Sequence, residues 1–361
     1  MVSVYLASTP LHILNSIAIA GKTSGSHHLV IIDQPNVEEN IYFTLLNSWE
    51  DSPFSSTHIF QGRIKSAKAK LKHRKSLFKS LKQLVKQWQP NQILTGNDRR
   101  IEFQFMMHTC HELGFNTRGS YMDEGTFTYV GRRASSGIGD KVIDNLIKKI
   151  IYGSWWSNPP TIGGSHWIKQ VYAAYPDLMI EQLKDKNLID LKTFYRDNDS
   201  VDSFSEHFLN HFQFDHSSLS DVDLLITTPH ESLVEKIPGY HQQLRSCINQ
   251  AVQKGKSVAM KYHPRNTDPD ILNLNDLSDI KIIPSAIPFE LICPLMNDII
   301  LVGDLSSTLI NASWLTPEIK ILALQIDSDK PEFGQLFSQL NIPVIEPRRL
   351  GETLSKMNSG S

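Results

Sequence analysis

The sequence has few cysteines, and none of them belongs to a paired motif. Its three cysteines, Cys110, Cys247 and Cys293, are far apart and form no CxxC pair. This usage argues against a disulfide framework and against a structural zinc site. It is typical of a protein from a reducing compartment, so we expect a cytoplasmic protein.

The sequence also has no large excess of positive or negative charge, and it has no long apolar runs. The chain has 36 Lys and Arg residues against 38 Asp and Glu residues, for a net charge of −2. This balance excludes a globally basic nucleic-acid binder, so any electrostatic partner site must come from local clustering. No apolar run approaches the roughly 20 residues that span a bilayer. The first 20 residues lack a charged n-region, and His12 and Asn15 interrupt them, which argues against a signal peptide.

The chain is long enough for about two domains, and both halves alternate short β-rich runs with helix-length segments. This pattern predicts βαβ units around parallel sheets. The predicted strands are Val2–Ala7, Leu29–Asp33, Ile93–Thr95, Gly119–Met122, Val222–Thr227, Ser257–Lys261, Ile280–Ile283, Ile299–Val302, Ile321–Leu324 and Pro343–Ile345. We expect two doubly wound α/β domains, 1–184 and 221–361, joined by a polar segment at 185–220. Their site should lie in a cleft that faces the carboxyl ends of both sheets.

Two loops of the first half carry polar residues directly after a predicted strand. Ser8 and Thr9 can either cap the next helix or hold an anion or a sugar with hydroxyl and backbone N–H groups. Asp123 and Glu124, followed by Gly125, have no basic neighbour in the sequence. They indicate either a solvated turn or the source of a general base.

A cationic loop with a His-Pro pair follows a predicted strand of the second half. Pro264 biases His263 toward an extended backbone, which directs the imidazole away from any helix. Lys261 and Arg265 flank the pair, and their charges suit a phosphate. A structural role for a lone histidine is the alternative.

Hydroxyl residues begin a predicted helix further along the second half. Ser306, Ser307 and Thr308 can cap this helix, or they can bind a phosphate or carboxylate with its free N–H groups. The GxxxxGK[ST] phosphate loop is absent. Pro288 and Glu290 lie in a nearby turn, where Glu290 could bond a ribose or simply favour the helix start.

The motifs occur in a definite order: an acidic pair with glycine, then His-Pro, then Ser-Ser-Thr. In this order they resemble the motifs of bacterial sialyltransferases, and the opening Tyr5-Leu6-Ala7-Ser8-Thr9-Pro10-Leu11-His12 is most similar to the capsular polysialyltransferase-type branch. The resemblance covers most of the chain in layout. It implies a GT-B fold and an inverting, metal-independent transfer from a CMP-activated sugar, with no cofactor.

The resemblance also implies a role for each motif. Asp123 would take the proton of the acceptor hydroxyl, with Glu124 as the substitute candidate, and His263 would hydrogen-bond and protonate the leaving CMP phosphate. The implied donor-binding residues are Ser306, Ser307, Thr308, Glu290, Pro288, Lys261, Pro264, Arg265 and Thr228. The implied acceptor-binding residues are Ser8, Thr9, Gly125, Lys68, Lys72 and Lys75. An inverting displacement needs such a carboxylate on one face and cationic donors on the other.

Residues 63–86 form a local basic cluster, with ten Lys and Arg residues and no Asp or Glu. Apolar residues recur there at helical spacing, so we expect one amphipathic helix or two consecutive ones. A face of one sign suggests an anionic partner. That partner is either an acidic glycan acceptor or the headgroups of an anionic inner membrane, and a solvated face is the alternative.

The leading hypothesis is a transfer of sialic acid from CMP-sialic acid to a hydroxyl of a capsule or lipopolysaccharide glycan. A transferase for another CMP-activated acidic sugar, such as Kdo or another nonulosonic acid, is a second candidate. A nucleotide-sugar epimerase or hydrolase of the same fold is a third. A non-catalytic glycan-binding module is the fourth.

Overall fold

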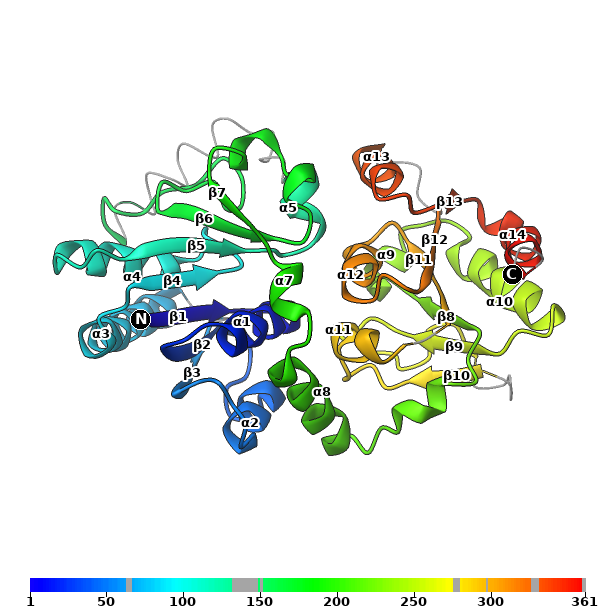
Figure 1. Ribbon diagram of the computed structural model, residues 1–361, viewed down its shortest axis with the longest axis horizontal. Coiled ribbons are helices and arrows are strands. Elements are labelled where there is room, and N and C mark those ends of the chain that lie inside the picture. Colours follow the sequence, from blue (N-terminus) through cyan, green and yellow to red (C-terminus); the bar gives the residue numbers. More distant parts are fainter. Residues whose placement is uncertain are drawn as a thin grey trace. The chain divides into compact units, whose positions relative to one another are not determined.

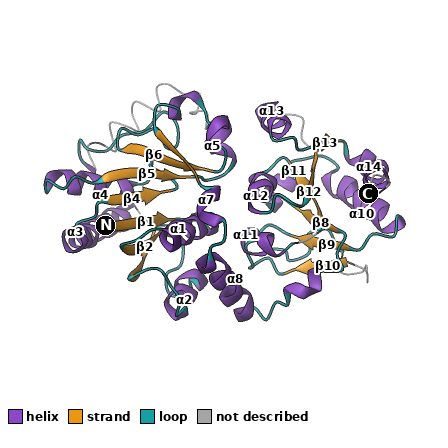
Figure 2. Cartoon of the chain, viewed as in Figure 1, coloured by secondary structure: helices purple, strands orange, loops and turns teal. Residues whose placement is uncertain are grey.

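The computed structural model describes residues 1–62, 67–131, 149, 152–274, 280–296, 298–325 and 331–358. The chain divides into two compact units, Met1–Phe208 and Leu209–Ser361. Each unit contains one parallel sheet whose strands are connected by helices (Figures 1 and 2). The two parallel α/β sheets expected from the sequence are therefore confirmed.

The first unit is built on a sheet of seven strands in the order β3-β2-β1-β4-β5-β6-β7. The strands are β1 (Val2–Ala7), β2 (Ser26–Gln34), β3 (Ser56–Gln61), β4 (Gln92–Thr95), β5 (Arg118–Met122), β6 (Ile168–Ala173) and β7 (Asn187–Asp190). Successive strands are added on one side of β1 as far as β3, and β4 is then added on the other side. The strand order of this unit thus reverses between β1 and β4.

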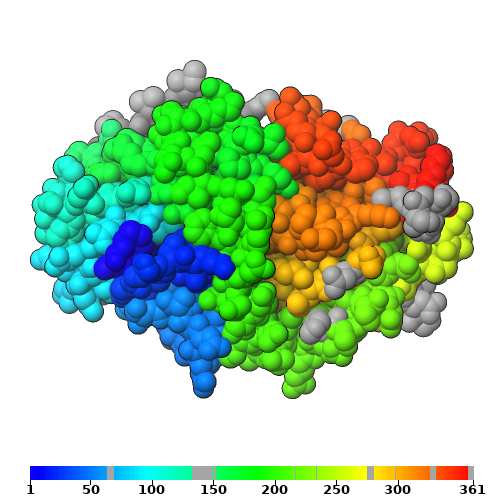
Figure 3. All heavy atoms as spheres, in the orientation of Figure 1, coloured from blue at the N-terminus to red at the C-terminus, as the bar shows by residue number. Residues whose placement is uncertain are grey.

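Helices connect these strands. They are α1 (Pro10–Lys22), α2 (Ile41–Ser48), α3 (Ala67–Trp88), α4 (Ile101–Glu112), α5 (Thr126–Val130), α7 (Lys192–Tyr195) and α8 (Asp199–His211). The α1 helix begins where Thr9 accepts a hydrogen bond from the His12 N–H, with Pro10 as its first residue. Residues 11–20 of α1 are all buried, so this helix belongs to the core. Met1 is 63% exposed, and part of the blue N-terminal segment is visible at the surface in Figure 3.

The second unit has a sheet of six strands in the order β10-β9-β8-β11-β12-β13. The strands are β8 (Leu224–Thr227), β9 (Val258–Lys261), β10 (Ile280–Ile283), β11 (Ile300–Asp304), β12 (Lys320–Leu324) and β13 (Val344–Ile345). Its helices are α9 (Glu231–Val234), α10 (Tyr240–Gln253), α11 (Phe289–Ile292), α12 (Ser307–Leu315), α13 (Pro331–Gln339) and α14 (Leu350–Asn358). The order reverses between β8 and β11, as it does between β1 and β4 in the first unit.

The structure adds three strands to those expected from the sequence: β3, β6 and β7. The segment 185–220, expected to be a polar connection, contains β7, α7 and α8. Because β7 pairs with β6, it extends the first sheet. Residues 63–66 of the basic segment lie outside the described residues, and the rest forms a single helix, α3. No helix in the described part of the chain is long and apolar enough to cross a membrane.

Candidate functional site

Three neighbouring strands of the first unit end in the loops that carry its polar candidates. Ser8 follows β1, residues 96–100 follow β4, and Asp123 follows β5. The strands β1, β4 and β5 are adjacent and parallel, so these loops leave the sheet at the same edge. Parallel α/β sheets bind ligands at this edge.

The Asp123 carboxylate is buried and held by several donors. Its Oδ1 accepts the Gly125 N–H at 2.8 Å, and its Oδ2 accepts the Ala174 N–H at 3.0 Å and the hydroxyl of Tyr129. Burial raises the pKa of Asp123, and these hydrogen bonds oppose that rise. The carboxylate is therefore fixed in direction, and its proton affinity lies above that of an exposed aspartate.

Glu124 differs from Asp123 in its surroundings. Its side chain is half-buried, and its backbone N–H donates to Thr128 Oγ1 at 3.2 Å. Gly125 has a φ of +94°, a region that glycine enters without the strain of a side chain. This glycine lets its N–H turn back onto Asp123, so the motif forms a closed loop rather than a solvated turn.

The loop after β4 was not singled out from the sequence. Asp98, at its centre, is buried and accepts the N–H groups of Gly163 at 2.9 Å and Ser165 at 2.7 Å. Arg99 Nη2 donates to the carbonyl oxygens of Pro159 and Pro160. These bonds fasten residues 159–165 to the end of β4, so this loop is a fixed part of the edge.

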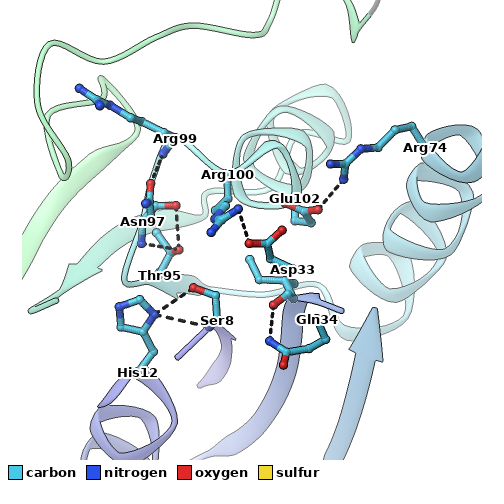
Figure 4. Close-up of polar contacts among 11 residues, drawn as sticks. Ser8, His12, Asp33, Gln34, Arg74, Thr95, Asn97, Arg99, Arg100 and Glu102 are labelled. Carbon is cyan, nitrogen blue, oxygen red and sulfur yellow. Dashed lines mark hydrogen bonds and ion pairs between the residues drawn. The ribbon is translucent and has the colours of Figure 1, made fainter. Parts of the chain in front are cut away.

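Ser8 and His12 form a polar pair at the edge between β1 and β4 (Figure 4). His12 Nδ1 accepts the Ser8 N–H at 3.4 Å and lies 3.3 Å from the Ser8 hydroxyl. Burial, with a smaller contribution from Arg100, lowers the pKa of His12 to about 3. The ring packs on Gly96, where an added Cβ would lie 2.0 Å from His12 Nε2. The capping role expected for this loop falls to Thr9, and Ser8 contacts His12 instead.

The α3 helix separates an apolar face from a basic one. Leu77, Leu81, Val85 and Trp88 are buried, whereas Leu71, which shares their helical spacing, is 46% exposed. The described exposed lysines are Lys70, Lys72, Lys75, Lys79, Lys82 and Lys86, and the side chain of Lys68 lies outside the described residues. The start of α3 lies near the strand ends, because His73 bonds the carbonyl of Gln61 at the end of β3.

The donor-binding candidates of the second unit follow four adjacent strands. Thr228 follows β8, His263 follows β9, Glu290 follows β10 and Ser306 follows β11, in a sheet where these strands are neighbours. Hydrogen bonds link the loops to one another. The Thr228 N–H donates to the Lys261 carbonyl at 3.2 Å, and Glu290 Oε1 accepts from Asn311 Nδ2 of α12 at 3.2 Å.

His263 is half-buried, and its ring lies 5.2 Å from that of His230 in the neighbouring loop. Its Nδ1 accepts the N–H of Arg265 at 3.1 Å, so the neutral ring carries its proton on Nε2. Burial is the main cause that lowers the pKa of His263 to about 4, and the charge of Arg265 adds to it. His263 is therefore a neutral hydrogen-bond donor at neutral pH.

Lys261 is buried at the end of β9. Its Nζ donates to the carbonyl oxygens of Ser285 at 3.1 Å and Tyr262 at 3.3 Å. Burial lowers the pKa of Lys261 to about 8, while the charge of Glu290 opposes this change. Burial in turn raises the pKa of Glu290. Pro288 is buried and immediately precedes α11, and Pro264 and Arg265 are exposed.

The start of α12 lacks a side-chain cap. Ser306 has an extended backbone, and its hydroxyl makes no capping hydrogen bond. Ser306, Ser307 and Thr308 are half-buried, and the buried Thr228 Oγ1 has no hydrogen-bond partner among the described residues. The N–H groups at a helix start and an unpaired hydroxyl suit an anion. Among the described residues, no three His, Cys, Asp or Glu side chains are grouped to hold a metal ion.

Comparison with known proteins identifies relatives at the level of family and of fold. Residues 57–325 match the family model described as alpha-2,8-polysialyltransferase (POLYST). A search of curated proteins found no match.

Solved structures share the fold at low sequence identity. The 2,6-sialyltransferase of Vibrionaceae Photobacterium sp. JT-ISH-224, in a ternary complex with CMP and lactose, is 14% identical with a TM-score of 0.57, covering 96% of this chain and 78% of that one. The UDP-GlcNAc 2-epimerase of Methanocaldococcus jannaschii is 14% identical with a TM-score of 0.55, covering 98% of this chain and 91% of that one. The architecture is that of GT-B enzymes, as the sequence resemblance implied.

The packing of His12 on Gly96 predicts a cost for a side chain at position 96. We expect Gly96→Ala to lower the free energy of unfolding by about 1–3 kcal/mol, because the buried imidazole must move. The matched control is Gly334→Ala in α13, where an added Cβ meets nothing within 4 Å. Urea denaturation of both variants measures the difference, and equal stabilities would contradict the packing described for His12.

Proposed function

Because the chain belongs to the alpha-2,8-polysialyltransferase family, whose members are CMP-sugar-dependent glycosyltransferases, we propose that it transfers sialic acid from CMP-sialic acid to a hydroxyl of a sialylated glycan of capsule or lipopolysaccharide type. The structural observation that supports this proposal most is the set of linked loops at one sheet edge of the second unit. These loops combine a neutral histidine donor, a buried lysine and an uncapped helix start. Such groups suit the phosphate of a leaving nucleotide.

In the proposed reaction the second unit stabilises the leaving group. The start of α12, with Ser306 and Ser307, binds the CMP phosphate through N–H and hydroxyl groups. His263 donates from Nε2 to a phosphate oxygen, because its Nδ1 is occupied by the Arg265 N–H. Binding of the anionic phosphate favours the imidazolium form of His263. As the bond between the anomeric carbon and the phosphate oxygen breaks, CMP leaves with the electron pair and takes up a proton from this imidazolium, which becomes a neutral ring.

The first unit supplies the base. A carboxylate takes the proton of the acceptor hydroxyl while its oxygen bonds the anomeric carbon from the opposite face, which inverts the configuration. Asp123 is the base of our proposal, since it follows β5 directly and burial raises its pKa, which makes its carboxylate a stronger base. The half-buried Glu124 is the alternative, because three protein donors already bind the Asp123 carboxylate.

The proposed roles predict losses of turnover in variants that remain folded. We expect Asp123→Asn and His263→Ala to lower the rate of transfer on the order of 10²–10⁴-fold. The measurement is CMP release and product formation from CMP-sialic acid and a sialylated acceptor. The exposed His241 of α10 supplies the control variant His241→Ala. Wild-type rates in His263→Ala would remove His263 from the mechanism, and a larger loss in Glu124→Gln than in Asp123→Asn would move the base to Glu124.

We also propose that the basic face of α3 attracts the anionic acceptor chain. Its exposed lysines extend from a helix start that lies near the strand ends. The charges attract an acidic polymer over a Debye length, about 10 Å at 0.1 M salt. An anionic membrane surface is the other partner that fits this charge.

A triple replacement tests the basic face. We expect Lys72→Gln, Lys75→Gln and Lys79→Gln together to raise the KM for a long acidic acceptor several-fold at low salt and to leave the KM for CMP-sialic acid unchanged. The difference should shrink at 1 M salt, where screening is strong. Stability should change little, because the lysines are exposed.

The control replaces the exposed lysines Lys236, Lys254 and Lys320 of the second unit by glutamine. An equal rise in acceptor KM in both triple variants would show that only net charge matters. Loss of binding to anionic vesicles with unchanged acceptor kinetics would assign the basic face to a membrane instead.

A further inference from the structure

The strand order of the first unit reverses between β1 and β4, and the roles proposed above leave the loop after β4 unused. In open α/β sheets, ligands bind outside the carboxyl ends of the strands at such a reversal. Ser8 follows β1 there, and Arg100 ends the loop that follows β4. Figure 4 shows Arg100 directed toward Asp33, above the pair formed by Ser8 and His12.

Arg100 forms an ion pair with one carboxylate, and this pair does not use all of its N–H donors. Its Nη1 lies 2.7 Å from Asp33 Oδ2, with side chains 35% and 21% exposed. Its Nε is buried and has no hydrogen-bond partner among the described residues. A guanidinium has five N–H donors arranged to bind a carboxylate at two points. Arg100 therefore has more donors than Asp33 uses, at a position that solvent can reach.

The backbone of β2 is distorted where it presents Asp33. The pairing of β2 with β3 changes register between Ile31 and Gln34, and Asp33 has a φ of +60°. The distortion requires a glycine opposite, because an added Cβ at Gly62 would lie 2.3 Å from Asp33 Cα. Irregular strand ends of this kind are common next to binding sites, where they redirect a side chain.

His12, drawn below Arg100 in Figure 4, has a second buried nitrogen without a hydrogen-bond partner among the described residues. Its Nδ1 accepts the Ser8 N–H, so the neutral ring carries its proton on Nε2. Nε2 is buried and finds no acceptor among the described residues, although His12 is only 2% exposed. A buried donor without a partner costs free energy, so this edge of the sheet carries a hydrogen-bonding capacity that the fold leaves unmet.

We propose that Arg100 binds the carboxylate of the terminal acidic sugar of the acceptor, and that this carboxylate displaces Asp33 from the guanidinium. The inference rests on the proposed function, since it takes the acceptor to be an acidic glycan. Without acceptor, Asp33 neutralises Arg100 and holds it in place. A neutral sugar cannot replace Asp33, because it offers no charge in exchange. Arg100 is thus a specificity-determining residue, and Asp33 is a competitor built into the fold.

Binding without donor tests this assignment independently of turnover. The probes are disialic acid and the same compound with its terminal carboxylate converted to a primary amide, each titrated against the full-length protein by calorimetry or NMR. We expect Arg100→Gln to weaken binding of the carboxylate probe about 10- to 100-fold and to leave binding of the amide probe nearly unchanged. Asp33→Asn should tighten the carboxylate probe several-fold, because the competitor has lost its charge.

Arg348→Gln is the matched control, because Arg348 forms an exposed ion pair with Glu346 in the second unit. It should bind both probes as the wild type does. Thermal unfolding of each variant confirms folding, and a partly exposed pair such as Arg100–Asp33 contributes little to stability. Equal effects of Arg100→Gln on both probes, or none, would overturn the inference, and weaker carboxylate binding in Asp33→Asn would overturn the role of Asp33 as competitor.

The experiment distinguishes a failure of the Arg100 assignment from a failure of the proposed function. If the wild-type protein transfers sialic acid while Arg100→Gln binds both probes normally, only the assignment of Arg100 is wrong. If the wild-type protein neither transfers sialic acid nor releases CMP from the donor, the proposed function fails. The contrast between the two probes at Arg100 then still shows whether the first unit binds an acidic sugar.

Discussion

Parallel pairing of the strands is the constraint on which the candidate site depends. In each sheet all strands run in one direction, so every loop that follows a strand leaves at the same edge. The acidic loop of Asp123 and the loop of Arg100 therefore share one edge of the first sheet, although they lie on different connections. In the second sheet the same constraint gathers Thr228, His263 and Ser306. Residues far apart in sequence become neighbours without any direct pairing between them.

Burial then determines the charge of the groups at these edges. Desolvation raises the pKa of Asp123 and Glu290 and lowers the pKa of Lys261 and His263. Each group is thereby moved toward its neutral form in the absence of substrate. An anionic phosphate next to His263 would reverse this effect and favour the protonated ring. Substrate binding itself would thus supply the charge that the leaving group requires.

The sequence predicted those parts of the molecule that depend on local chemistry. The strands β1 and β10 have the expected bounds, because each is a short run dominated by β-branched or apolar residues. The strands β3, β6 and β7 escaped prediction: polar residues interrupt Ser56–Gln61, and the four residues of β7 pair with only one neighbour. Leu71 has the helical spacing of the apolar residues of α3, yet it is exposed. The spacing of apolar residues shows which of them share one face of a helix, but it does not show how much of that face packs against the rest of the protein.

The loop of Arg100 shows why the site was only partly predictable. Its strand was expected, but its importance comes from the strand order, which places β4 beside β1 rather than beside β3. The register change that directs Asp33 at Arg100 depends on a contact with Gly62, 29 positions away (62 minus 33). Neither feature leaves a local mark in the sequence. Motifs with their own chemistry, such as Asp123-Glu124-Gly125, could be singled out without a structure.

Amide hydrogen exchange with and without CMP tests the central claim most directly, because it reports where the nucleotide binds without requiring turnover. We expect CMP to slow exchange in the loops after β8, β9, β10 and β11, with the strongest protection at the start of α12 around Ser307. The His263→Ala variant should need more CMP for the same protection. Protection confined to residues outside these four loops, or unchanged exchange at millimolar CMP, would contradict the assignment of the second unit as the donor-binding half.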